Sequence, residues 1–149
     1  MKKILSVALV VVLIVAFVMV FVSQKQDNNP SINTQIIGNW TLIKFNDQEI
    51  DLQNASNENN LVITTDTISG KLCNGFSSDN YQINDDIITA SLISTQMACI
   101  DNDGQPTPIM SAETALGQGL YYGFKIAFGR NHELILQDVD NLLVFIPQE

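Results

Sequence analysis

Two cysteines and one histidine are the residues of this chain best suited to nucleophilic or redox chemistry. In a domain that reaches an oxidising compartment, Cys73 and Cys99 would most simply form a structural disulfide, which would stabilise the fold by about 3.5 kcal/mol. Two alternatives stay open: both thiols are free, or one cysteine is a nucleophile with His132 as its base. No third orienting group accompanies that pair, so we favour the disulfide.

The acidic residues could hold a metal ion or act as an acid–base pair, but their spacing favours turns. The run Asp101-Asn102-Asp103-Gly104, with Glu113 downstream, suggests a calcium loop, yet no register places a carboxylate at its last position. Asp85-Asp86 lies between two strand-like runs and is interpreted as a turn. We therefore predict no catalytic residue, no metal site and no cofactor, and expect that the protein is not an enzyme.

The charge of the chain narrows the classes of partner. The formal net charge is −9, and all 16 acidic residues follow the first 23 residues. Such a surface repels phosphate groups, so binding to nucleic acid is close to excluded.

The N-terminus contains an apolar run from Ile4 to Val22, interrupted only by Ser6. As a helix this run would span about 28 Å, close to the thickness of a bilayer core. We predict an uncleaved signal-anchor over residues 1–23, with a cleaved signal peptide as the alternative. Because Lys2 and Lys3 precede the run, the N-terminus is expected in the cytoplasm and the remainder outside the cytoplasmic membrane. Residues 24–35 are polar and are predicted to be a flexible linker.

The remaining residues, 36–149, alternate short β-like runs with turn signals. The runs are predicted over residues 40–45, 61–65, 67–73, 87–94, 121–128, 133–137 and 142–146. One helix is expected from Pro108 to Leu120, because apolar residues recur on one helical face. This pattern predicts a mainly β domain of the α+β class, a small antiparallel barrel or curled sheet with one helix.

Four short motifs resemble those of the META domain family, which includes heat-shock protein HslJ. The first is Gly38-Asn39-Trp40-Thr41-Leu42, which resembles a G-x-W-x-L opening, and the second is the step Cys73-Asn74. The third, Thr95-Gln96-Met97-Ala98-Cys99, resembles the T-x-M-A-C signature, and Glu113 resembles the Glu that opens the helix. The likeness covers about residues 36–149. Leu72 departs from it, since the family usually has Gly there, and the segment 100–107 is longer than usual.

The resemblance implies a lipocalin-like barrel with one helix, an envelope protein associated with stress tolerance, and no defined catalytic activity. It supports Cys73 and Cys99 as structural residues and places Trp40 and Met97 in the core. The motif residues carried over from the family are Gly38, Trp40, Leu42, Asn74, Thr95, Met97, Ala98 and Glu113.

Two functions follow as hypotheses. The first is a membrane-anchored, extracytoplasmic, non-enzymatic structural or interaction module, bound to the membrane by its N-terminal helix and to an unknown envelope protein. The second is a small barrel that binds a lipid or another apolar molecule. A cavity above roughly 300 Å³ would favour the second hypothesis, whereas large core side chains such as Trp40 and Phe124 would oppose it by filling the lumen.

Overall fold

A computed structural model describes residues 31–50 and 59–148. The predicted signal-anchor and residues 24–30 of the predicted linker lie outside the described residues. Within the described ranges, no helix is both long and apolar enough to cross a membrane.

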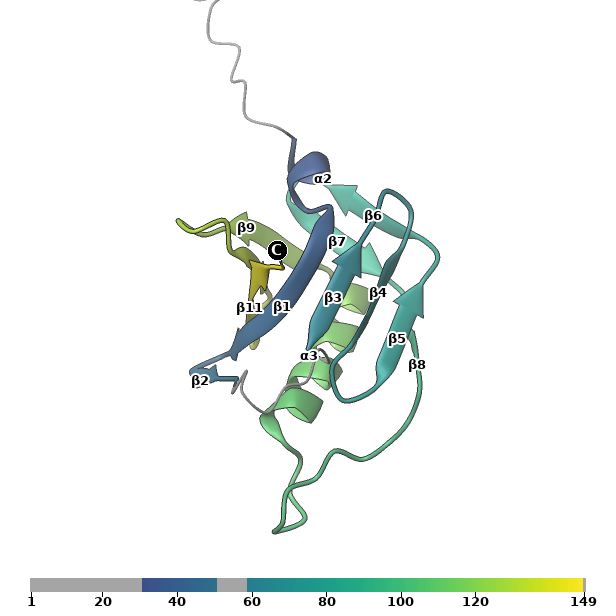
Figure 1. Ribbon diagram of the computed structural model, residues 1–149. Helices are drawn as coiled ribbons and strands as arrows, with labels where there is room; N and C mark the ends of the chain where they lie inside the picture. The colour runs from purple at the N-terminus through teal and green to yellow at the C-terminus, as the bar shows by residue number, and fades with distance from the viewer. Residues whose placement is uncertain (1–30, 51–58, 149) are drawn as a thin grey trace, which may run out of the picture. The chain divides into compact units, whose positions relative to one another are not determined.

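The described chain forms short strands, one long helix and one short helix (Figure 1). The helices are α2 (Ile32–Gln35) and α3 (Pro108–Tyr122). The strands are β1 (Gly38–Phe45), β2 (Gln48–Glu49), β3 (Asn60–Ile63), β4 (Ile68–Lys71), β5 (Gly75–Ser78), β6 (Tyr81–Asn84), β7 (Ile87–Ala90), β8 (Ile93–Ser94), β9 (Phe124–Phe128), β10 (Leu134–Gln137) and β11 (Leu142–Pro147).

The strands form one antiparallel sheet in the order β6-β7-β9-β10-β11-β1-β3-β4-β5-β8, with β2 paired to β1. The sheet curls into a half-barrel, and α3 lies behind β3 and β4 in Figure 1. β6 and β8 are its two edges among the described strands. The predicted class, a mainly β curled antiparallel sheet with one helix, is therefore confirmed.

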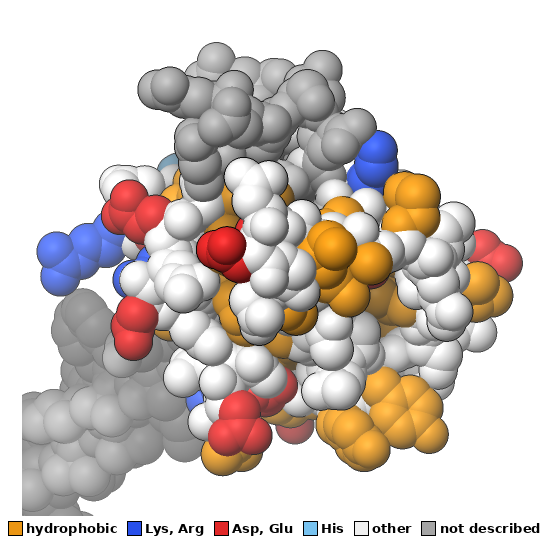
Figure 2. Space-filling view, turned by 90° about the horizontal axis from the view of Figure 1, so that it is seen from below, with side chains coloured by type: hydrophobic (Ala, Val, Ile, Leu, Met, Phe, Trp, Pro, Cys, Tyr) orange, Lys and Arg blue, Asp and Glu red, His pale blue; other side chains and the backbone are white. Residues whose placement is uncertain are grey.

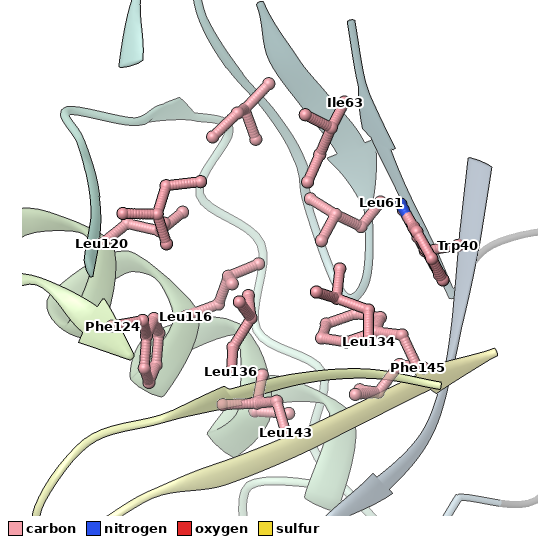
Figure 3. Packing of buried hydrophobic residues seen from close by; sticks show 14 of the residues in the cluster. Trp40, Leu61, Ile63, Leu116, Leu120, Phe124, Leu134, Leu136, Leu143 and Phe145 are labelled. Atoms are coloured by element: carbon pink, nitrogen blue, oxygen red, sulfur yellow. The ribbon is translucent and has the colours of Figure 1, made fainter. Parts of the chain in front are cut away.

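The core fills the inside of the curl. Alternate residues of β1, Trp40 and Leu42, point inward and are buried, as the two-residue period of a strand requires. The buried residues of α3 are Ala112, Ala115, Leu116, Gly119 and Leu120, which share one helical face. Figure 3 shows Leu116 and Leu120 of α3 among the leucines and Phe145 contributed by β10 and β11. Phe124 is also fully buried.

The boundary between the predicted helix and the strand after it differs from the structure. The helix continues to Tyr122, so Tyr121 and Tyr122 end α3 instead of beginning a strand. A strand at this position would place one tyrosine in the core and one at the surface. Both instead project from the helix end and are exposed. Gly123, with φ of +116°, ends the helix and lets the chain turn into β9.

The predicted linker also differs at its end. Residues 32–35 form the single turn α2, and Ile32 packs against the core. Ile36 follows and is completely buried. The backbone of this segment is ordered because Ile32 and Ile36 bury apolar surface that offsets the loss of conformational entropy.

Candidate functional site

The motif residues near the middle of the chain meet at Asn74, which lies just before β5 and is buried. Its Nδ2 donates hydrogen bonds to Glu113 Oε1 at 2.8 Å and to the carbonyl oxygen of Met97 at 3.2 Å. Its Oδ1 accepts from the Met97 N–H at 2.6 Å and from Thr95 Oγ1 at 3.3 Å. One amide side chain thus joins β5, the segment after β8 and helix α3.

Glu113 completes this arrangement from the helix. Its Oε2 accepts a hydrogen bond from the backbone N–H of Asn74. The resemblance places Glu113 at the opening of the helix, but the structure places it in the second turn. The cap is Thr107, whose Oγ1 accepts from the Met110 N–H at 3.3 Å, and Pro108 occupies the first turn. A Thr-Pro step before an apolar period is the sequence signal for this helix start.

Cys73 and Cys99 are joined by a disulfide, with the two Cα atoms 5.9 Å apart. The predicted disulfide is therefore confirmed. Both sulfur atoms are bonded to each other, so neither is available as a thiolate nucleophile. His132 lies in the β9–β10 hairpin, exposed and with φ of +60°, as a turn residue.

The expected burial of Met97 is wrong. Its residue is 61% exposed, whereas the backbone N–H and carbonyl of Met97 are both bound by Asn74. The segment from β8 to α3 is thus held by its backbone, and the Met97 side chain contributes no core packing. Thr95 and Ala98 are exposed as well.

The other motif lies at the start of β1. Trp40 is buried as expected, and its Nε1 donates a hydrogen bond to the Ile36 carbonyl at 2.9 Å. Gly38 lies against the Trp40 ring and has an extended φ of 159°. Leu42 is fully buried. This motif therefore fixes the chain where it enters the sheet, through the bond from Trp40 to Ile36.

The expected turns are found. Asp85-Asp86 connects β6 and β7, and Asp86 forms an ion pair with Lys125 at 3.4 Å. Asp101 Oδ1 accepts from the N–H groups of Asp103 and Gln105, so this carboxylate organises its own loop. Among the described residues, no three of the metal-binding types His, Cys, Asp and Glu gather at one place.

An open groove of about 560 Å³ lies beside α3. Its lining comes from β5, from the residues around β8 and from the exposed flank of the helix, and consists of Phe76, Ser91, Leu92, Ser94, Glu113, Thr114, Gly117, Gln118, Tyr121 and Tyr122. The two tyrosine rings are perpendicular, with centroids 5.1 Å apart. The sequence does not predict this groove, because it favours a strand at Tyr121 and Tyr122, which belong to the helix.

The surface around these elements mixes polar and apolar side chains. Figure 2 shows the molecule from below. On this face hydrophobic side chains reach the surface in separate groups, with acidic side chains and polar atoms between them. Exposed large apolar residues near the groove include Ile93, Tyr121 and Tyr122. The groove is therefore lined by both polar and apolar side chains, unlike the apolar interior of the curled sheet.

The fold is a small half-barrel with one disulfide, and its motif residues join β5, the segment after β8 and helix α3. The sequence model of the META domain matches residues 34–149, and the chain belongs to this family. No curated protein matches the chain significantly.

Two solved structures share the fold. One NMR structure of a protein is 20% identical, with a TM-score of 0.60, and the match covers 72% of this chain and 86% of that one. An NMR structure of a protein from Burkholderia xenovorans is 19% identical, with a TM-score of 0.56, covering 84% of this chain and 94% of that one.

Proposed function

We propose that this protein is a membrane-tethered META domain that works outside the cytoplasm as a non-enzymatic interaction module in the cell envelope. The observation that carries the proposal is the Cys73–Cys99 disulfide. Disulfides persist in oxidising compartments and are rare in the cytosol. The apolar run Ile4–Val22 supplies a route to such a compartment and a tether to the membrane.

The arrangement of the motif residues supports a module without catalysis. Asn74 and Glu113 satisfy each other and the backbone of Met97, so their polar atoms are committed to holding the fold. The cysteines are committed to their disulfide. The surface groove beside α3 then offers a place where a partner could dock.

The hypothesis of a lipid carrier is less well supported. The groove exceeds 300 Å³, but it is open to solvent, and six of its ten lining residues are exposed. Inside the curl, side chains such as Phe124, Phe145 and Leu116 occupy the space that a lipid tail would need. A carrier must enclose most of its ligand, so we favour the interaction module.

The test is the intact mass of the protein isolated from its own membranes, before and after reduction and alkylation. We expect the chain to retain Met1–Ser23 and to gain two alkyl groups only after reduction. The Cys73→Ser/Cys99→Ser variant should gain none, and a variant lacking residues 1–23 should remain in the cytosol and be alkylated directly. Two reactive thiols in the membrane-bound protein would contradict the proposed location.

A further inference from the structure

The groove beside α3 is bordered by a free edge of the sheet. β8 pairs antiparallel with β5, and no other described strand pairs with it. Ser94 lies on β8 and also lines the groove. An unpaired strand edge presents N–H and carbonyl groups that can bond to another extended chain.

The register shows which backbone groups point to the free side. The Thr95 N–H donates to the Gly75 carbonyl at 3.0 Å, so the backbone of Thr95 faces β5. Backbone groups of successive strand residues point to opposite sides. The N–H and carbonyl of Ser94, which is opposite Phe76, therefore point away from β5.

The walls of the groove favour one kind of occupant. Leu92 and Phe76 supply apolar surface on the sheet side, and the exposed rings of Tyr121 and Tyr122 rise from the helix. The lining contains one charged residue, Glu113, and no Lys or Arg, and the whole chain carries a net charge of −9. Both oxygens of Glu113 already accept from Asn74. It is therefore the negative charge of the chain as a whole that favours a partner with basic side chains.

We propose that an extended, basic peptide segment of a partner protein binds in this groove by adding a strand to β8. Its backbone pairs with the N–H and carbonyl of Ser94, and its apolar side chains contact Leu92 and the tyrosines. Main-chain bonds give such a complex its affinity, and the side-chain surfaces give it selectivity. This proposal deepens the proposed interaction module and rests on it.

The test uses the full chain in nonionic detergent micelles and a fluorescent peptide with alternating valine and lysine. We expect binding with a Kd on the order of 1 mM or below, and protection of the Ser94 amide from hydrogen exchange. Ser94→Pro removes the donating N–H without breaking a bond to β5, and proline is tolerated on a free edge. Ser94→Ala keeps the N–H and removes only the hydroxyl, which makes it the matched control.

We expect Ser94→Pro to weaken binding at least tenfold and Ser94→Ala to leave it unchanged. Equal losses in both variants would overturn the proposal, because they would show that the peptide recognises the Ser94 hydroxyl and not the backbone N–H. Equal affinity for a valine–glutamate peptide would also overturn it. If Ser94→Pro does not fold, absence of exchange protection in the wild-type protein would refute it instead. Protection that depends on protein concentration without peptide would assign the edge to a second copy. None of these outcomes bears on membrane location, which the mass measurement tests separately.

Discussion

At the scale of the residue, Asn74 shows why this step of the sequence tolerates few alternatives. The site needs two donors facing Glu113 and Met97 and an acceptor facing the Met97 N–H. Only an amide side chain offers both kinds of group at this length. Aspartate has the same shape as asparagine but lacks its N–H donors. A change from Asn74 to aspartate therefore alters the hydrogen bonding and leaves the packing unchanged.

We expect Asn74→Asp to lower the free energy of unfolding by about 3 kcal/mol, because a buried carboxylate would face Glu113 without donors between them. Urea denaturation measures the change. Asn80→Asp, at an exposed position before β6, should change it by less than about 0.5 kcal/mol. Adding Glu113→Gln to Asn74→Asp should recover part of the loss, since the new amide donates to the aspartate. A double variant no more stable than the single one would contradict this account.

Tyr81 is a second residue whose environment has a measurable consequence. Its hydroxyl donates to the Thr64 carbonyl at 2.7 Å, linking β6 to the β3–β4 turn. Burial, and secondly the negative charge of Asp66, raise the pKa of Tyr81 above its ordinary value. The neutral phenol is therefore favoured in the folded state.

Because this pKa is higher in the folded than in the unfolded protein, the stabilisation is complete below the unfolded-state value of about 10. It is lost as the pH rises from there through the folded-state pKa. We expect stability to fall above about pH 10, and Tyr81→Phe to reduce that fall. Tyr122→Phe, on an exposed ring, is the matched control for removing a phenol hydroxyl. The measurement is the free energy of unfolding at several pH values, with tyrosinate absorbance followed in the same samples.

At the scale of the element, helix α3 contains two glycines with opposite roles. Nothing lies near the position of a Cβ at Gly117, whereas a Cβ at Gly119 would overlap the ring of Phe124. Gly119 thus allows the first residue of β9 to pack across the helix. Both glycines lower the helix propensity of α3, but only Gly119 allows a packing contact, with Phe124.

We expect Gly117→Ala to raise the free energy of unfolding by about 0.5–1 kcal/mol, through helix propensity alone. Gly119→Ala should lower it by about 1–3 kcal/mol, because Phe124 must move out of its buried place. Thermal unfolding followed by circular dichroism compares the two variants under identical conditions. Stabilisation by both alanines would show that Phe124 does not rest on Gly119.

Elements with strong periodicity were predictable, and those defined by long-range contacts were not. The β-like run at residues 40–45 and the apolar face of α3 predicted both elements. β5 and β6 were missed, because their polar residues alternate with few apolar ones. Tyr121 and Tyr122 have high β propensity, but they continue the helix, which ends only at Gly123. The meeting of Asn74 with Glu113 depends on tertiary folding, which spacing along the chain does not reveal.

At the scale of the molecule, the disulfide and the Asn74 hydrogen bonds secure the same region. The segment between β8 and α3 contains few hydrogen-bonded strand residues, and it is attached through Cys99 and Met97. Removing the disulfide should therefore loosen this segment before the sheet.

We expect Cys73→Ala/Cys99→Ala to lower the free energy of unfolding by about 3 kcal/mol. Hydrogen exchange should accelerate most in residues 95–107 and least in β10 and β11, which pair far from the disulfide along the sheet. The wild-type protein, unreduced, is the reference. Uniform acceleration across the sheet would mean that the disulfide acts on the whole domain and not on this segment.

The position of β1 in the sheet has a consequence for how the protein is made. β1 pairs on one side with β3 and on the other with β11, where Trp40 lies opposite Pro147. One side of β1 can pair once β3 has been synthesised, but the other must wait until β11 has followed. Through that interval an apolar strand has an unpaired edge beside the growing polypeptide. Completion of the domain is thus a late event, and a ribosome that stalls before β11 releases a chain unable to close its own sheet.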